Sequence, residues 1–283
     1  MSSSHVQLHW TSSPVPNLIA KLDDLHDTSS TVFELIQWGG AAVPLLADAL
    51  LRGRPRSVSE PRCCLVRVLA DLDANDVLLE YLRSGGPIDD PEIRFAEDSV
   101  INAAARALKL DFSADAYSTL FSLAERRCLP GVLESLAMYR RIETIPCFIR
   151  ALESDLSRQA ATESLESFGQ AAKPYLLTEA FRREPNPPDS ESTSSRHRRS
   201  DCLKLLERLH LSDLDRERLL SLLAEQDCQM VMSVGQILLA SKNKTAQAAA
   251  SRCLNAFRSQ IAWPLRDECI DLTNKLGQAS ENI

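Results

Sequence analysis

Apolar residues recur along most of the chain at intervals of three and four, the spacing of one face of an α-helix. In WGGAAVPLLADALL, residues 38–51, Leu46 and Leu50 follow this spacing after a pair of glycines. Gly39 can adopt the left-handed conformation that ends a helix. Pro44 stands in the first turn of the next helix, where its missing N–H is not needed. The pattern therefore predicts two antiparallel helices joined by a tight turn.

The same sequence of turn and helix residues returns further along the chain. FGQAAKPYLLTEAF (168–181) repeats the glycine, alanine, proline and leucine positions of residues 38–51, and YRRIETIPCFIRAL (139–152) repeats those from the proline onward. LADLDANDVLLEYL (69–82) gives the same helix pair with Asp-Ala-Asn at the turn. Recurrence of a helix pair about every thirty residues is typical of stacked helical repeats.

These segments resemble the HEAT-repeat class of α-solenoids, close to the bacterial type found in phycobilisome lyase-like proteins. The shared signature is a first helix ending in Leu-x-x-aromatic/Leu-Gly and a second helix opening with Ala-x-Pro-x-Leu. It is clearest in residues 31–52 and 155–183, and looser in 58–84 and 130–153. The resemblance implies an all-α fold, an α-solenoid of antiparallel helix pairs arranged in a curved superhelix.

The pattern divides the chain into five parts. We expect an N-terminal segment with a capping helix (1–28), five HEAT-like repeats (29–183), a Pro/Ser-rich flexible loop (184–200), further HEAT-like helices (201–277) and a tail (278–283). The loop is expected because EPNPPDSESTSSRHRRS has no apolar period. The predicted helices are 16–27, 29–39, 41–52, 58–72, 75–84, 91–109, 113–127, 130–140, 142–153, 155–168, 171–183, 201–210, 214–225, 227–240, 243–257 and 263–276.

Composition restricts the class of protein. Hydrophobic residues make up 44% and charged residues 25%, with a net charge of −7. An acidic chain argues against a general nucleic-acid binder, since such proteins need many cations to neutralise phosphates. Neither a signal peptide nor an apolar run long enough for a membrane span is found. None of the eight cysteines forms a CxxC pair. We therefore expect free thiols, a cytoplasmic location and no membrane.

No catalytic or metal-binding motif is found. GxSxG, GxxxxGK[ST], GxGxxG and HExxH are absent, and the histidines are scattered without ligand spacing. Cys63 and Cys64 are the one vicinal pair; because adjacent helical residues point about 100° apart, one should be buried and the other partly exposed. A helix start in which Asp90 caps and Pro91 opens the helix accounts for most of the acidic cluster in residues 88–100. The alternative is a cation site, which would need ligands that converge in space. We predict a protein that is not an enzyme and has no cofactor.

Arginines gather where the second helix of each predicted pair ends. In a stack of helix pairs all second helices run the same way, so these ends line one edge. We predict a basic ridge there and outward acidic positions beside it, on which a partner docks. The candidate partner-binding residues are Arg54, Arg56, Arg126, Arg127, Arg150, Arg182, Arg183, Asp48, Glu80 and Glu179. Arg196, Arg198 and Arg199 would continue the ridge. The alternative interpretation is that these cations only stabilise helix C-termini.

Three functions remain open. The first is a non-catalytic protein–protein interaction scaffold or adaptor, for example of the immunity or regulator type, that binds another protein on its concave face or basic edge. The second is a lyase-like enzyme or enzyme subunit with a tetrapyrrole or small-molecule pocket, which visible absorbance of the purified protein would reveal. The third is a nucleic-acid-binding HEAT module that uses the arginine ridge, for which binding should depend steeply on salt.

Overall fold

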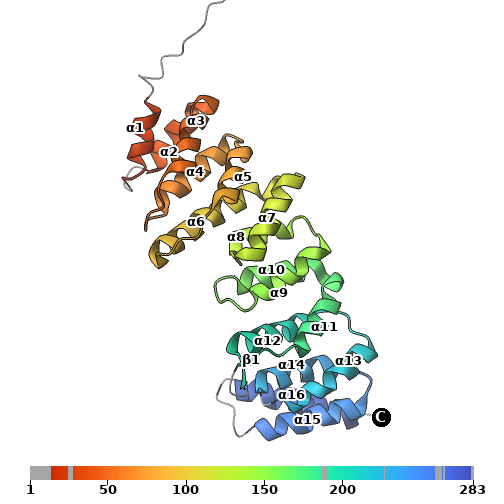
Figure 1. Ribbon diagram of the computed structural model, residues 1–283. Coiled ribbons are helices and arrows are strands. Elements are labelled where there is room, and N and C mark those ends of the chain that lie inside the picture. The colour runs from red at the N-terminus through yellow and green to blue at the C-terminus, as the bar shows by residue number, and fades with distance from the viewer. Residues whose placement is uncertain are drawn as a thin grey trace, which may run out of the picture. The chain divides into compact units, whose positions relative to one another are not determined.

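The computed structural model describes residues 14–24, 28–186, 190–225, 227–258, 263 and 265–281, and this part of the chain is all-α, as the sequence predicts (Figure 1). Its strands are confined to a short ladder of β1 (Pro185–Asn186) and β2 (Ser190–Glu191). The chain forms two compact units, unit 1 over residues 1–139 and unit 2 over residues 140–283. None of the described helices is both long and apolar enough to cross a lipid bilayer.

Unit 1 is built from two layers of helices. Helices α2, α4, α6 and α8 contact one another in succession and form one layer, and α1, α3, α5 and α7 form the other in the same way. Their bounds are α1 (Val15–Lys21), α2 (Thr28–Gln37), α3 (Val43–Arg52), α4 (Glu60–Asp71), α5 (Asn75–Ser84), α6 (Pro91–Ala107), α7 (Ala114–Arg126) and α8 (Pro130–Ala137), with 3-10 turns η2 (Gly39–Ala41) and η3 (Leu108–Leu110). The apolar stripes of both layers meet between them, where Leu46, Leu69 and Leu78 are fully buried.

Small residues set the close approach of α6 and α8. Ala104 and Ala105 are completely buried on α6. The N–H of Gly131 donates to Oδ1 of Asn102 at 2.7 Å, and a Cβ at Gly131 would lie only 2.5 Å from the Asn102 carbonyl oxygen. The hydroxyl of Ser135 donates to the carbonyl of Ala105 at 2.8 Å. Backbone of one helix therefore touches the next, which larger side chains would prevent.

The predicted turns are confirmed at their glycines. Gly39 has φ +57° and Gly169 has φ +53°, a region that L side chains adopt at a cost. Each glycine is the first residue of a 3-10 turn, which leads into a helix with proline in its first turn, Pro44 in α3 and Pro174 in α11 (Lys173–Phe181). The glycine reverses the chain and the proline starts the next helix without losing a hydrogen bond.

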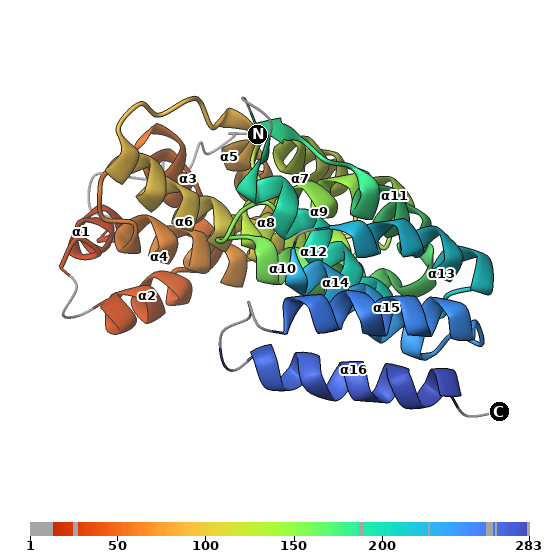
Figure 2. The same ribbon diagram turned by 90° about the horizontal axis from the view of Figure 1, so that it is seen from below.

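Unit 2 begins with the helix pair α9 (Ile145–Ala151) and α10 (Arg158–Phe168) and ends with α15 (Lys244–Phe257) and α16 (Leu265–Glu281), which lie side by side (Figure 2). Between them α11 packs on α12, α12 on α14, and α14 on α15. The remaining elements are η4 (Ile142–Thr144), η5 (Gly169–Ala171), α12 (Thr193–Glu207), α13 (Asp213–Leu219), η6 (Leu220–Ala224) and α14 (Cys228–Leu239). Most predicted helices thus agree with observed ones and differ at their ends.

Two predicted boundaries are wrong. The expected flexible loop over 184–200 is helical from Thr193 onward, because Ser192 accepts a hydrogen bond from the N–H of Ser195 at 3.1 Å and begins α12. The helix shows no apolar period there because part of its buried face is ionic, with Arg198 and Arg199 buried. The expected tail over 278–283 is helical as far as Glu281, because α16 continues through Gly277 and beyond the fully buried Leu276. Residues 1–13, 25–27, 187–189, 226, 259–262, 264 and 282–283 of the predicted segments lie outside the described residues.

Candidate functional site

The structure brings two of the predicted arginines, Arg54 and Arg127, to one pocket in unit 1. This pocket has a volume of about 470 Å³ and lies at the C-terminal ends of α3, α5 and α7, against α6. Its walls are mostly apolar and include the aliphatic side chains of Leu50, Ile88 and Ile101. We call it the arginine pocket. It is lined by Leu50, Leu51, Gly53, Arg54, Pro55, Arg62, Tyr81, Ser84, Gly85, Gly86, Pro87, Ile88, Ile93, Glu97, Ile101 and Arg127.

A buried polar cluster forms the floor of the arginine pocket. Nη2 of Arg62 lies 2.9 Å from Oε1 of Glu97, and their side chains are 10% and 9% exposed. The hydroxyl of Tyr81 donates to the same carboxylate oxygen at 2.6 Å. Burial, and then the neighbouring charge of Glu97, raises the pKa of Tyr81, so the phenol keeps its proton. Nε of Arg62 is buried and has no hydrogen-bond partner among the described residues.

Gly53 allows the guanidinium of Arg62 to reach this position. Nη1 of Arg62 donates to the carbonyl of Gly53 at 3.0 Å. A Cβ at Gly53 would lie 2.2 Å from the carbonyl oxygen of Ala49 and 3.2 Å from Nη1 of Arg62. Any larger residue would therefore push the loop after α3 away from α4. The floor depends on this close backbone approach.

The rim of the pocket carries the remaining charges. Nη1 of Arg127 lies 3.0 Å from Oδ1 of Asp98, and both side chains are about a quarter exposed (26% and 28%). Burial raises the pKa of Asp98, and the charge of Arg127 opposes that rise. Arg54 is exposed, and its side chain forms no ion pair or hydrogen bond with the described residues. Arg54 is therefore the rim cation that a ligand meets without displacing a partner.

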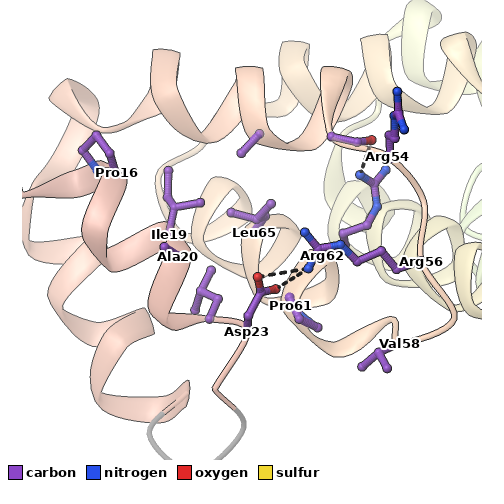
Figure 3. Close-up of a pocket in the computed structure, with 13 residues that line it drawn as sticks. Pro16, Ile19, Ala20, Asp23, Arg54, Arg56, Val58, Pro61, Arg62 and Leu65 are labelled. Atoms are coloured by element: carbon purple, nitrogen blue, oxygen red, sulfur yellow. Dashed lines mark hydrogen bonds and ion pairs between the residues drawn. The ribbon is translucent and has the colours of Figure 1, made fainter.

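A second hollow of about 330 Å³ shares Gly53, Arg54 and Arg62 with the arginine pocket and extends toward α1 (Figure 3). At its edge the side chains of Asp23 and Arg56 point toward one another, with Nη1 of Arg56 2.9 and 3.0 Å from the two carboxylate oxygens. Both side chains are more than half exposed. Such a surface pair contributes little stability, but it neutralises Arg56.

A third hollow, of about 420 Å³, lies between α5 and α7. We call it the arginine–serine hollow; its lining residues are Arg83, Ser118, Thr119, Ser122 and Arg126. Nε of Arg83 donates to Oγ1 of Thr119 at 3.0 Å, and Nε of Arg126 donates to the carbonyl of Ser122 at 3.3 Å. The predicted site residue Arg126 therefore belongs to this hollow, while the next residue, Arg127, belongs to the arginine pocket.

The two acidic candidates of unit 1 contribute to neither cavity. Asp48 forms an i,i+4 ion pair with Arg52 at 2.9 Å, in which both side chains are exposed. Glu80 is exposed on α5. Neither residue lines the arginine pocket or the arginine–serine hollow. Their positions fit solvated helix faces.

In unit 2 the predicted ridge is largely neutralised within the protein. Arg183 lies 2.6 Å from Glu225, and Arg182 lies 3.3 Å from Glu179. Burial alone would raise the pKa of Glu225, but hydrogen bonds from Arg183 and then Arg199 lower it below its usual range. Arg150 is exposed at the end of α9. The prediction that Glu179 points outward is wrong, since its side chain is only 15% exposed.

The expected continuation of the ridge through Arg198 and Arg199 is also wrong. Arg198 is 3% exposed, with Glu153, Glu179 and Glu184 around its guanidinium. Arg199 is fully buried between Glu191 and Glu225. These arginines tie the segment after α11 to α12 and present no charge to a partner. Arg196 is exposed, 3.9 Å from Asp227.

The cysteines follow the sequence prediction. Cys64 is buried and Cys63 is half-buried, and all eight thiols are free. Burial, and then the charge of Glu60, raises the pKa of Cys64 to about 11 and raises that of Cys63 as well. Reactive cysteines show the opposite shift. Within the described ranges no group of three metal-ligating side chains is found.

The floor of the pocket is not among the residues that the local pattern predicts. Ile93, Glu97 and Ile101 stand four residues apart on α6, so a carboxylate interrupts an otherwise apolar stripe. Arg62 precedes Leu65 and Leu69 on the buried face of α4 in the same way. A charged residue on the apolar face of each of two neighbouring helices is the available sequence signal for a buried ion pair.

Comparison with known proteins gives no relative. No family model matches the chain, and neither a curated protein nor a solved structure is detectably similar to it. The case for a function therefore rests on the geometry of the site alone.

Proposed function

We propose that this protein is a non-catalytic protein-interaction module, a scaffold or adaptor of the HEAT-like α-solenoid kind. We further propose that unit 1 binds an acidic segment of a partner protein at the arginine pocket. The two layers of stacked helices in unit 1 support the solenoid arrangement. The observation that carries the binding function is the exposed, unpaired Arg54 at the rim of a pocket with aliphatic walls.

The chemistry of the pocket favours a peptide that combines an aliphatic and an acidic side chain. Three arginines, Arg54, Arg62 and Arg127, meet two carboxylates, Glu97 and Asp98, so the region is locally positive on a chain of net charge −7. Apolar walls provide area to bury, and the few polar groups fix orientation. Arginine is also among the residues that contribute most to protein interfaces.

Peptide display on the full chain tests the proposal. A random peptide library is selected on the wild-type protein, and the enriched peptides are then measured by fluorescence anisotropy. We expect peptides with an acidic residue next to an aliphatic one. Arg54→Glu should lower the affinity for these peptides about tenfold or more, because a rim cation is replaced by a charge of the same sign as the peptide's acidic residue.

The matched control is Arg258→Glu. Arg258 is also an exposed arginine just after a helix, α15, and its side chain likewise forms no ion pair with the described residues. This variant should bind as the wild type does. The site would be refuted if the selected peptides showed no preference for acidic residues, or if Arg54→Glu and Arg258→Glu lost peptide affinity equally. If the protein instead bound an oligonucleotide more tightly than the peptides, and this binding depended steeply on salt, the nucleic-acid function would replace the peptide-binding function.

A further inference from the structure

We propose that the arginine–serine hollow binds a phosphoryl group carried by a side chain of the partner protein. The inference rests on the proposed function, because it takes the ligand to be a segment of a protein bound to unit 1. It adds a second recognition point, beside the arginine pocket, and a chemical class of ligand.

The two guanidinium groups are positioned by contacts that leave other donors for a ligand. Nε of Arg126 is directed to the Ser122 carbonyl within its own helix, and the described residues offer no carboxylate to its terminal N–H groups. Nε of Arg83 is held by Thr119, which itself donates to the carbonyl of Asp115 at 2.7 Å. Two oriented guanidinium forks across one hollow suit an anion with several acceptor oxygens.

Hydroxyl groups complete the hollow. Ser118 and Ser122 stand four residues apart on one exposed face of α7, between the two arginines. The hydroxyl of Ser118 donates to the carbonyl of Asp115 at 3.1 Å. The side chain of Ser122 makes no hydrogen bond with the described residues, so it can donate to a ligand oxygen. A phosphoryl group has three terminal oxygens and a charge near −2, which two arginines and a hydroxyl satisfy better than they satisfy a carboxylate.

The placement of the hollow connects it to the arginine pocket. Arg83 and Ser84 are consecutive at the end of α5, and Arg126 and Arg127 are consecutive at the end of α7. In each pair the first residue lines the hollow and the second lines the pocket. A peptide anchored in the pocket therefore has the hollow within reach of a neighbouring side chain.

A single phosphoryl group fits better than a polyanion. Asp115 is 76% exposed and lies 3.5 Å from Nη2 of Arg83, so a carboxylate borders the hollow. A nucleic-acid backbone would meet this charge and a chain of net charge −7. A single group can displace Asp115 from Arg83. The Asp115→Asn variant should therefore bind the phosphorylated ligand more tightly, by about twofold to tenfold.

The experiment compares two fluorescent peptide mixtures, identical except that one has phosphoserine and the other serine at the central position. Anisotropy is measured with the full-length protein. We expect the phosphorylated mixture to bind about tenfold tighter, and Arg126→Gln to remove that advantage. Arg252→Gln is the matched control, since Arg252 is an exposed arginine of α15 whose Nε also contacts the carbonyl four residues earlier. Inorganic phosphate should compete with the phosphorylated peptides for the wild-type protein, and this competition should disappear in Arg126→Gln.

The outcomes separate the two proposals. If both mixtures bind equally and Arg54→Glu weakens both, the arginine pocket stands and the phosphoryl site is refuted. If the phosphorylated mixture gains affinity that Arg126→Gln does not remove, the hollow is not where the group binds. If inorganic phosphate or inositol phosphates bind through Arg126 but neither peptide mixture does, the partner-protein origin of the phosphoryl group is overturned. Gain of affinity in Asp115→Asn with loss in Arg126→Gln supports the site.

Discussion

The ion pair at the floor of the arginine pocket should control the stability of unit 1. Glu97→Ala would remove the carboxylate that contacts Arg62 at 2.9 Å and Tyr81 at 2.6 Å. Removing one partner of a buried ion pair costs about 3–5 kcal/mol, because the other charge stays buried without compensation. The Tyr81 hydroxyl also loses its acceptor, which costs a further ~1–3 kcal/mol unless water enters the pocket. We expect a total loss of at least about 3 kcal/mol.

A second variant distinguishes an uncompensated charge from a simple loss of packing. In the double variant Arg62→Met, Glu97→Leu both charges are replaced by apolar groups of similar size. The cost of burying two charges and the attraction between them are therefore removed together. The double variant should be more stable than Glu97→Ala by about 2 kcal/mol or more. Glu97→Gln, which keeps an acceptor but loses the charge, should fall between the wild type and Glu97→Ala.

Hydrogen exchange measured by mass spectrometry on the full chain is the suitable assay, because it reports each unit separately. Protection of peptides from α4, α5 and α6 should fall by about two orders of magnitude in Glu97→Ala. Peptides from α14 and α15 in unit 2 provide the internal reference and should be unchanged. A loss below about 1 kcal/mol, or equal loss in α14 and α15, would refute the reasoning.

Three further predictions follow from local geometry. Gly39→Ala should destabilise the protein by about 1–2 kcal/mol because φ at Gly39 is +57°. Gly40→Ala should not, since Gly40 has no positive φ and no atoms lie close to its Cβ position. Urea unfolding compares the free energies of unfolding of the two variants. The hydrogen bond from Arg106 lowers the pKa of Glu134, so the roughly 0.5 kcal/mol that this pair contributes to stability is present above the usual glutamate pKa of about 4 and is lost as the pH falls through the lower folded pKa. Glu134→Gln should abolish this pH dependence of the unfolding midpoint. A wild type that stays more stable than Glu134→Gln by the same amount at acid pH would contradict the prediction. Burial raises the pKa of Cys64 to about 11, so native alkylation at neutral pH should be slow and should become fast on unfolding, as mass spectrometry would show.

The local pattern was enough to predict the helix pairs and their turns. Gly39 and Gly169 are recognisable as turn positions because glycine marks a helix end and a following proline marks a helix start, and each signal needs only a few neighbouring residues. The prediction that one of Cys63 and Cys64 is buried and the other more exposed follows from the helical period in the same way, and the structure shows that Cys64 is the buried one. The sequence also placed Arg54 and Arg127 at helix ends, which is where the candidate site lies.

The helical segment at 193–200 shows where local pattern fails. Pro, Ser and Arg in this stretch are typical of an exposed loop. The structure buries Arg198 and Arg199 because glutamates from α11, β2 and the residue after η6 converge on them. Glu191 lies only eight residues from Arg199 and Ser192 caps the helix locally, but Glu153 and Glu225 lie 45 and 26 residues away from the arginines they contact. The local pattern therefore contains the helix start but not the partners that bury the two arginines.

Helix period, capping and turn chemistry act over a few residues, so the local sequence is enough to specify the all-α class, the repeated helix pairs and the arginines at helix ends. Tertiary structure alone decided which arginines are exposed. It left Arg54 unpaired at the rim of a pocket, neutralised Arg183 with Glu225, and buried Arg62 against Glu97. The charge that a guanidinium presents to a partner depends on the carboxylates that packing brings to it, and packing joins residues that the local pattern cannot relate.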